Sequence, residues 1–303
     1  MIKKIVLFFG VMIWTAPFLI MLLIAFSSKN TNSFVELLSE NPLTFHNFIT
    51  AWQEAEFSRY FVNTVIITVV SVLIVLMVTA LSGYIMGYFD FKGKKLISAV
   101  MMISMGIPTI FFTIPVYQIL RMLNCDTSLM GMILAEVGGG HVIFILLFSR
   151  FFSSIPGALR ESALLDGANE FDVFFKIMFP LATPMIGTVV ITQSIWTWNS
   201  FLYPLILSVN KPEIRTLSVG LYSFQGENIV EWGNIAAGAC ITILPMLVLF
   251  VMFQKSFIPV SYTHLVREVL DAGANIIVAG SALFKGDPAQ NTKEFMEILK
   301  SYE

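Results

Sequence analysis

Apolar positions fill most of the chain in long blocks that short polar stretches separate. A helix that crosses the hydrocarbon core of a bilayer needs roughly 20 apolar residues. Blocks of about that length or more lie at about 5–26, 62–88, 96–120, 129–152, 183–207 and 235–258. Turn-forming stretches such as Asn41-Pro42 and Asn210-Lys211-Pro212 follow some of them. The pattern therefore predicts an all-α membrane protein with six transmembrane helices.

Composition supports this class and excludes others. The 303 residues are 56% hydrophobic, with a mean hydropathy of +0.80, which lies outside the range of a soluble globular domain. A net charge of -2 provides no basic surface for a nucleic acid. Cys125 and Cys240 fall in different segments without metal-ligand spacing, so we interpret them as ordinary small apolar residues.

The distribution of Lys and Arg predicts the orientation in the membrane. With the N-terminus in the cytoplasm, the inner side holds nine Lys and Arg residues and the outer side five. This orientation also places the segment 153–182 in the cytoplasm. Lys3-Lys4 and the apolar run after them are also compatible with a signal peptide. The run is long for that role and no clear cleavage site follows, so a retained helix is the better interpretation.

The cytoplasmic segment ESALLDGANEFDVFFKIMFPLATP carries four carboxylates in a chain of which only 13% is charged. We expect one helix from Pro156 to Leu165, a turn at Asp166-Gly167, and a second helix from near Asn169 that ends before Pro180. Gly167 is useful at that turn because a tight connection between helices often needs positive φ.

The second helix is predicted to be amphipathic. Its apolar positions recur at i, i+3, i+4 and i+7 and are expected to face the bundle: Phe171, Phe174, Phe175 and Met178. Glu170, Asp172 and Lys176 would project to the other side. Arg160, Glu161 and Asp166 on the first half would be free to meet a partner. From spacing alone, a solvated interfacial loop is an equally good interpretation.

The spacing resembles the cytoplasmic signature loop of ABC importer permeases, E-A-A, three residues, G, nine residues, I-x-L-P. Here Glu161-Ser162-Ala163, Gly167 and Ile177-Met178-Phe179-Pro180 keep that spacing, with departures at Ser162 and Phe179. The resemblance covers about residues 1–258. FSRYFVNTVIITV and WNSFLYPLILSVNKPEIRTLSVGL, among other stretches, resemble the smaller permease subunit of carbohydrate-type importers, the maltose and glycerol-phosphate uptake branch.

The resemblance implies a role and a set of partners. The loop would form coupling helices that dock into a cleft of a cytoplasmic ATPase dimer, a role that transfers by position to Glu161, Ser162, Ala163, Asp166, Gly167, Ile177 and Pro180. A sister permease would complete a heterodimer in the cytoplasmic (inner) membrane, among its lipids. An extracytoplasmic solute-binding protein would deliver a carbohydrate. The particular sugar, and whether the envelope has one membrane or two, stay open.

Polar residues inside the apolar blocks are candidates for a substrate path, because they are costly at membrane depth. Glu136 stands beside a glycine run and His141, although a carboxylate near the interface is an equally good interpretation. In the fifth block, polar and aromatic residues recur near helical spacing and suit a sugar ring, or equally a subunit contact: Gln193, Trp196, Asn199 and Tyr203.

Two further sets carry weaker signals. The third block offers a less definite path of the same kind, made of Thr109, Thr113, Tyr117 and Gln118. Gly83 and Gly87 form a small-xxx-small surface, which we assign to helix packing.

Catalysis in this chain is not expected. His46, His141 and His264 lie in different segments, and the sequence has no P-loop, no H-E-x-x-H and no G-x-S-x-G. We therefore expect no cofactor and no metal in this chain, with ATP and Mg²⁺ bound by the partner ATPase. A secondary transporter is the alternative, but that class usually shows internal repeats and broken helices, and neither is expected from the six blocks.

After about residue 258 the character changes. Residues 266–303 predict a strand, ANIIVAGSALF, and an amphipathic helix that opens at Asp287-Pro288 and has Phe295, Ile298 and Leu299 on one face. This stretch resembles the last strand and helix of ribulose-phosphate 3-epimerase, in which the turn corresponding to Gly280 and Ser281 binds phosphate. The remaining barrel is missing, so we expect no activity. Residues 259–265 match neither family, and we interpret them as a junction between two fragments.

Overall fold

The computed structural model describes residues 2–28, 43–53, 56–139, 141–224, 230–253 and 288–300, and nearly all of them are helical. The chain divides into two units, Met1–Phe253 and Gln254–Glu303. The predicted all-α class is confirmed. The predicted strand at 274–284, the residues Gly280 and Ser281 and the junction at 259–265 lie outside the described residues.

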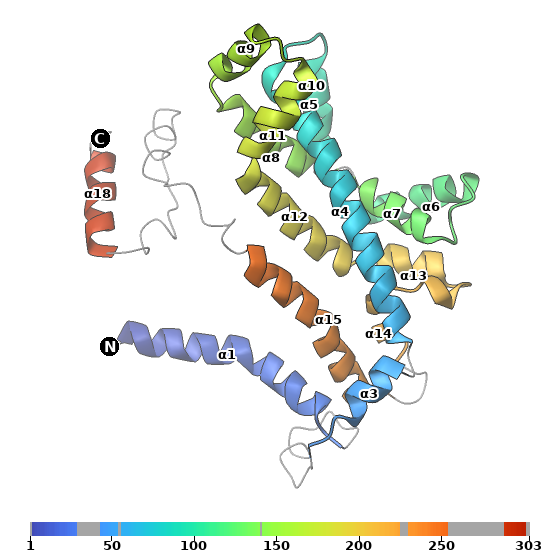
Figure 1. Ribbon diagram of the computed structural model, residues 1–303. Coiled ribbons are helices and arrows are strands. Elements are labelled where there is room, and N and C mark those ends of the chain that lie inside the picture. The colour runs from blue at the N-terminus through green and yellow to red at the C-terminus, as the bar shows by residue number, and fades with distance from the viewer. Residues whose placement is uncertain are drawn as a thin grey trace. The chain divides into compact units, whose positions relative to one another are not determined.

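The first unit contains many helices of very different lengths (Figure 1). Their bounds in chain order are α1 Ile2–Ala25, α3 His46–Gln53, α4 Phe57–Tyr88, α5 Lys94–Ser104, α6 Thr113–Met122, α7 Leu129–Val137, α8 Val142–Ser153, α9 Gly157–Leu165, α10 Glu170–Val173, α11 Phe179–Leu181, α12 Thr183–Trp198, α13 Leu202–Ser208, α14 Leu217–Tyr222 and α15 Trp232–Phe253. Short 3₁₀ turns span Thr109–Phe112 and Pro212–Ile214, and a π-helical turn spans Phe174–Met178.

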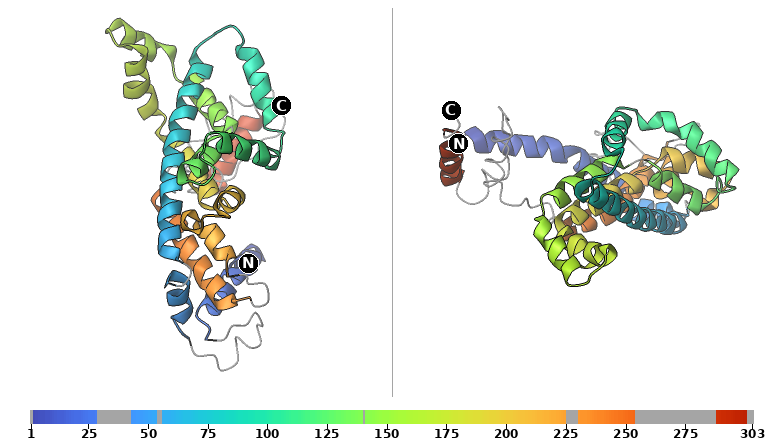
Figure 2. Two further views of the ribbon diagram at one scale, coloured as in Figure 1. Left: turned by 90° about the vertical axis from the view of Figure 1, so that its right-hand side faces the viewer. Right: turned by 90° about the horizontal axis from the view of Figure 1, so that it is seen from above.

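Helix α4 is the element against which much of the first unit packs. It contacts α8, α12 and α7 along its length, and α3 and α14 near its start. Figures 1 and 2 show α9 and α10 beside the end of α4 that leads to α5, with α3 and α14 at the opposite end. Three buried clusters therefore form along one helix, and Tyr84, Ile67 and Phe57 are among the α4 residues of successive clusters.

Three helices are long and apolar enough to cross a membrane unbroken, namely Leu7–Ala25, Phe57–Tyr88 and Trp232–Met252. Three further candidates are bent pairs of shorter helices, so the described residues hold up to six spans if each pair crosses once. The bends are 102° between α5 and the segment Thr109–Met122, 53° between α7 and α8, and 77° between Glu170–Leu181 and α12.

The prediction of a continuous helix in each of the blocks 96–120, 129–152 and 183–207 was wrong, because each block contains a break. Pro108 breaks the first, since proline has no N–H donor and disfavours helical backbone in the residue before it. The second is interrupted after Val137, where the Gly138 N–H still bonds the Leu134 carbonyl as the helix ends. The third ends at Trp198, and α13 begins at Leu202.

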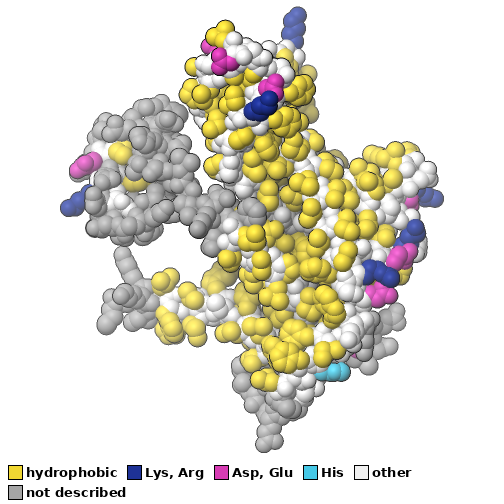
Figure 3. Space-filling model, in the orientation of Figure 1, with side chains coloured by type: hydrophobic (Ala, Val, Ile, Leu, Met, Phe, Trp, Pro, Cys, Tyr) yellow, Lys and Arg dark blue, Asp and Glu magenta, His cyan; other side chains and the backbone are white. Residues whose placement is uncertain are grey.

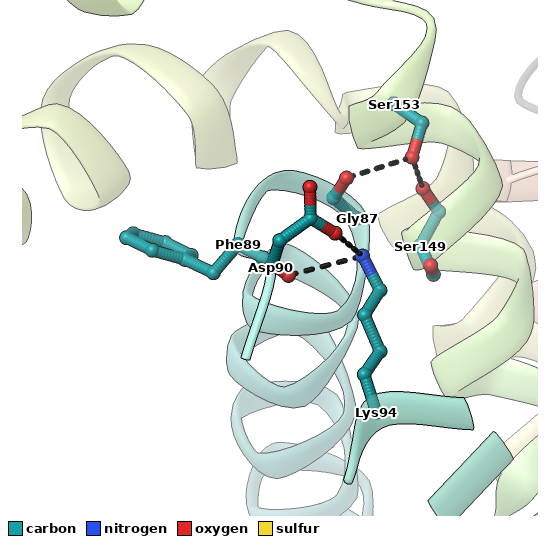
Figure 4. Close-up of polar contacts among 6 residues, drawn as sticks. All are labelled: Gly87, Phe89, Asp90, Lys94, Ser149 and Ser153. Atoms are coloured by element: carbon teal, nitrogen blue, oxygen red, sulfur yellow. Dashed lines mark hydrogen bonds and ion pairs between the residues drawn. The ribbon is translucent and has the colours of Figure 1, made fainter. Parts of the chain in front are cut away.

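Gly83 and Gly87 bring α4 into backbone contact with α8, which confirms their predicted packing role. A Cβ atom on Gly83 would clash with the Cβ of Phe148, and one on Gly87 would lie 2.8 Å from the Ser149 carbonyl oxygen. Ser153 Oγ also donates to the Gly87 carbonyl at 3.1 Å (Figure 4). Only glycine permits two helices to approach this closely.

The turn between α4 and α5 is closed by one lysine. Lys94 Nζ donates to the Phe89 carbonyl at 3.0 Å and pairs with Asp90 Oδ1 at 3.1 Å (Figure 4). Gly93, with φ +93°, supplies the left-handed residue before α5 begins. This turn fixes where α5 starts relative to the end of α4.

The surface of the first unit agrees with a membrane environment. Large apolar side chains are exposed along α1, α4 and α15, among them Trp14, Leu73 and Val251. Figure 3 shows charged side chains at the end that carries α9 and α10 and on the side of α6 and α13, with apolar surface between them.

In the second unit the described residues form one helix, α18, Pro288–Lys300. Phe295 is buried, and Ile298 and Leu299 are half-buried. The predicted amphipathic helix is confirmed.

Replacing Gly83 by leucine is expected to destabilise the first unit. The added side chain clashes with Phe148, and overpacking of this kind typically costs about 1–3 kcal/mol. Unfolding of the purified protein by SDS in mixed micelles measures the loss. Gly10→Leu is the matched control, because a Cβ atom there has no neighbour within 4 Å. Equal midpoints for the two variants would contradict the close packing of α4 and α8.

Candidate functional site

The turn of the predicted coupling loop has a defined hydrogen-bonding pattern. At the end of α9, the Gly167 N–H bonds the Leu164 carbonyl at 3.1 Å and the Ala168 N–H bonds the Ala163 carbonyl at 3.0 Å. This pair of bonds is the Schellman motif, which needs a left-handed residue at the position of Gly167. Gly167 has φ +90°, so its expected positive φ is confirmed.

The second half of the loop starts as predicted but does not end as predicted. The Asn169 side chain caps α10 by accepting from the Asp172 N–H at 2.9 Å. The helix then widens into the π-helical turn Phe174–Met178 and continues through Pro180 to Leu181. The predicted end before Pro180 was wrong, because the wider turn lets the Phe179 N–H bond the Phe174 carbonyl and the chain passes the proline without stopping.

Only half of the predicted apolar stripe faces the bundle. Phe174 and Met178 are buried against α4 and α8 together with Val173. Phe171 is 72% exposed and Phe175 44% exposed. The short α10 and the π-helical turn change the helical phase, so the buried face follows Val173 instead of Phe171.

The positions that match the importer motif divide between surface and core. The surface group is Glu161, Ser162, Asp166, Gly167 and Pro180. Ala163 and Ile177 are half-buried, and Ala163 packs on the cluster around Phe152 and Phe174. The motif therefore presents a polar outer side while its alanine holds α9 on the bundle.

An ion pair joins the two halves of the loop to α4. Arg160 on α9 pairs with Glu170 on α10, with Arg160 Nε 3.2 Å from Glu170 Oε2. The Tyr84 hydroxyl donates to the same Oε2 atom at 3.1 Å. The Arg160 guanidinium also lies 5.1 Å from the centre of the Phe89 ring. The Glu170 carboxylate raises the pKa of the Arg160 guanidinium, which stays charged.

This arrangement corrects two predictions. Arg160 is not free to meet a partner, and Glu170 points back to the bundle instead of outward. Opposite charges on the two halves of a helical hairpin were visible in the sequence, but their pairing depends on the angle at the turn. Asp172 and Lys176 do pair at the surface, at 2.6 Å. A further bond, from the Tyr88 hydroxyl to the Ile155 carbonyl at 2.8 Å, anchors the start of the loop to α4.

A cavity of about 710 Å³ lies among α5, α6, α7, α8, α12 and α13. Four of the five predicted path residues line it: Glu136, Gln193, Trp196 and Tyr203. Asn199 does not line it, because its Nδ2 donates to the Ile195 carbonyl of its own helix at 2.8 Å. In the weaker set, Thr109 lines the cavity, whereas Thr113, Tyr117 and Gln118 do not.

Three helix interruptions meet at this cavity. Its lining includes residues before and after the breaks at Pro108, at Gly138 and Gly139, and at Ser200. Backbone that leaves the helical form at membrane depth is tolerated where it lines a cavity or is covered by protein. Tyr203 reaches the cavity from α13, beyond the break, instead of from a continuous fifth helix as predicted.

Two buried acceptors in the cavity lack partners. The Oε1 atoms of Glu136 and Gln193 have no hydrogen bond within the described structure. Gln193 is only 1% exposed, and its Nε2 donates to Thr197 Oγ1 at 3.0 Å. Buried acceptors are normally paired, so the two open acceptors are an exception within the bundle.

Aromatic rings form a flat part of the wall. Trp196 stacks on Phe144 at 5.2 Å between ring centres, and His141 stacks on the same Phe144 at 5.9 Å. Trp196 stays 49% exposed, which leaves ring surface for a ligand. The sequence analysis missed Ser104, Phe112 and Ser200, which also line the cavity, because nothing in their local pattern marks them. No cluster of three His, Cys, Asp or Glu that could hold a metal occurs in the part of the chain that the structure describes.

Comparison with known proteins identifies the architecture. Residues 79–257 match the family described as binding-protein-dependent transport system inner membrane component. The chain belongs to this family. The sequence-based argument against a secondary transporter was that no broken helices were expected. The structure of this permease has broken helices, so that argument no longer holds. The evidence against a secondary transporter is now the family match.

Relatives of this permease come from several bacteria. It is 31% identical to the probable ABC transporter permease protein YurM of Bacillus subtilis, over 80% of each chain. It is also 31% identical to the melibiose/raffinose/stachyose import permease protein MelC of the same species, over 80% of this chain and 87% of that protein. The diacetylchitobiose uptake system permease protein NgcG of Streptomyces coelicolor is 29% identical, over 70% of each chain.

A solved structure shares the fold. The crystal structure of a bacterial ABC transporter involved in the import of the acidic polysaccharide alginate superposes with a TM-score of 0.74 at 20% identity, covering 84% of this permease and 95% of that chain. The resemblance to ABC importer permeases stated above is confirmed.

Replacing Glu170 by glutamine is expected to loosen α9. The change removes the charge that holds Arg160 and Tyr84, and a charge-assisted bond of this kind contributes about 1.5–3 kcal/mol when shielded and less at partial exposure. Amide hydrogen exchange in α9 should become several-fold faster. Asp172→Asn is the control, since Asp172 lies two residues from Glu170 and its pair with Lys176 does not involve α4. Unchanged exchange in the Glu170 variant would contradict the bracing role.

Proposed function

We propose that this permease is the membrane-spanning subunit of an ATP-driven, binding-protein-dependent importer that carries a sugar or related carbohydrate by alternating access. Support for the substrate class comes from relatives named for diacetylchitobiose, for arabinooligosaccharides and for melibiose, raffinose and stachyose. The cavity wall suits such a ligand, because it combines aromatic surface with unpaired hydrogen-bond acceptors.

The observation that carries the proposal is the direct connection between the loop and the cavity. Only Ala182 separates α11, the end of the loop, from α12. Gln193 and Trp196 on α12 line the cavity. A push on the loop therefore moves the cavity wall without an intervening flexible segment, as rigid-body switching requires.

The outer surface of the loop offers a contact for an ATPase subunit. Leu165 is 88% exposed and Phe171 is 72% exposed, on either side of the Gly167 turn. Glu161 and Asp166 are exposed in the same loop. Apolar side chains with a polar surround are typical of protein contacts. We assign Glu161, Ser162, Ala163, Asp166, Gly167, Ile177 and Pro180 to the coupling site on this basis.

The remaining parts of the assembly follow from the same proposal. The ATPase dimer binds ATP and Mg²⁺ in the cytoplasm, a sister permease completes the transmembrane pair, and a solute-binding protein presents the sugar on the other side. The excess of Lys and Arg in the loops that include 153–182 supports a cytoplasmic N-terminus and a cytoplasmic coupling loop. The chain itself has no catalytic role, and this includes its C-terminal unit.

Reconstitution in lipid vesicles tests the function. The permease is combined with candidate ATPase and sister permease subunits, and ATP turnover is measured against a panel of solute-loaded binding proteins. We expect turnover and uptake to rise together with one binding protein and to need every subunit. Full uptake by this chain alone would favour the secondary transporter that the broken helices also fit.

Replacing Gly167 by valine should leave the protein inserted but abolish ATP-dependent uptake, with a loss of at least tenfold. The reason is the positive φ, since a Cβ atom at this position meets nothing within 4 Å. A β-branched residue in the left-handed region costs roughly 1–2 kcal/mol or more, so the Schellman turn rearranges. Uptake and membrane content are measured in the same vesicles.

Two further variants control this result. Gly157→Val adds the same side chain to the first residue of α9, where there is open space and no positive φ, and it should transport normally. Gly167→Asn should be milder than Gly167→Val, because asparagine tolerates the left-handed region better. Normal uptake by Gly167→Val would refute the coupling role of the turn.

A further inference from the structure

Helices α4 and α12 pack side by side and run in opposite directions (Figure 1). Near the start of α4, the Phe61 ring meets the Trp198 ring at the end of α12, with 5.9 Å between the ring centres. Further along α4, Val75 shares a buried cluster with Val189 of α12. These two contacts give the register of the seam between the helices, and the middle of the seam lies between them.

The middle of this seam is polar and buried. Thr68 and Ser71 lie between Phe61 and Val75 on α4, and Gln193 lies at the corresponding level of α12. Each of these three polar residues is at most 5% exposed. Polar side chains buried in a helical bundle are normally hydrogen-bonded, because an unpaired one costs free energy.

The three side chains instead leave a complementary set of atoms unpaired. The hydroxyls of Thr64 and Thr79, also buried on α4, each donate to a carbonyl of their own helix at 2.7 Å. The hydroxyls of Thr68 and Ser71 have no hydrogen bond within the described structure. Gln193 Oε1, an acceptor, is unpaired as well. Two possible donors on α4 and one acceptor on α12 therefore occupy the same level of the seam without being bonded.

The seam differs from the contact on the other side of α4. There, the backbones of α4 and α8 meet at Gly83 and Gly87. Helix α12 meets α4 partly through short hydroxyl side chains, and only Ala182 separates it from α11, the end of the proposed coupling loop. A push on that loop would therefore change the position of α12 against α4, and with it the distance from the two hydroxyls to Gln193.

Resting on the proposed function, we propose that Thr68 and Ser71 are positioning residues of the transport cycle, which donate to Gln193 Oε1 when α12 takes a second register on α4. In the present register the three groups are unpaired, which raises the free energy of this conformation. In the second register they are bonded, which stabilises the other conformation. The seam thereby narrows the free-energy gap between two states that the cycle must visit in turn.

Replacing Thr68 by valine tests this proposal, because valine keeps the shape of threonine and removes the hydroxyl. Since that hydroxyl is unpaired in the present register, the midpoint of unfolding of the purified permease by SDS should stay equal or rise. Uptake by the complete reconstituted assembly should fall roughly threefold or more, because the second register loses a hydrogen bond. Ser71→Ala should show the same combination of results.

Two variants serve as controls. Thr79→Val removes a buried hydroxyl of the same helix that is already bonded to the Val75 carbonyl, so it should leave uptake unchanged. Thr68→Ser keeps the donor, so it should transport as the wild type does.

A hydroxyl with a merely structural role would lower the unfolding midpoint and uptake together. A lower midpoint in Thr68→Val would show that the hydroxyl is already bonded in the present register, for example through water, and would overturn the proposal. Normal uptake by Thr68→Val and Ser71→Ala beside an active wild type would overturn it as well. An inactive wild-type assembly would instead refute the proposed function. If one of the two variants fails to insert, the other decides.

Discussion

The structure depends on the rule that backbone N–H and C=O groups cannot stay unpaired in lipid. A chain under this rule interrupts its helices only where protein or a cavity receives the freed groups. Here the breaks at Pro108, after Val137 and after Trp198 all border one cavity, although they are far apart in the sequence. The apolar helices α1, α4 and α15 stay unbroken and expose large side chains outward. The interruptions therefore mark the interior of the bundle.

A second set of contacts stiffens the proposed coupling loop. The Gly167 turn is closed by two backbone bonds, Asn169 caps the following helix, and the pair of Arg160 and Glu170 holds both halves against Tyr84. These bonds are local and polar. Because the loop leads into α12 through Ala182 alone, its rigidity is shared with the helix that carries Gln193 and Trp196.

Sequence reasoning predicted the parts that depend on short-range rules. The length of the apolar blocks gave the class, motif spacing led to the family, and the Asp166-Gly167 turn and Asn169 restart follow from capping preferences. It failed where three-dimensional geometry decides. The pairing of Arg160 with Glu170 depends on the angle between two helices, and the exposure of Phe171 depends on a π-helical turn that periodicity does not reveal.

The residues of the cavity were also predicted only in part. Glu136 was identified because an ionisable residue in an apolar block is costly, and Gln193 because it belongs to a polar-aromatic stripe at helical spacing. Asn199 was included by spacing, yet it bonds its own helix, and Ser200 was missed although it is the next residue. A periodic stripe assumes a continuous helix, so it misplaces residues at the point where the helix stops. Cavity residues next to helix breaks are therefore the ones that periodicity assigns least well.

The glycine contact between α4 and α8 has a further consequence for how the molecule moves. The backbones of α4 and α8 touch at Gly83 and Gly87, so no layer of side chains between them could slide or repack. We therefore expect these two helices to move as one rigid unit. If the proposed alternating access takes place, its displacement is expected in the segments next to the helix breaks at Pro108 and Ser200, which border the cavity.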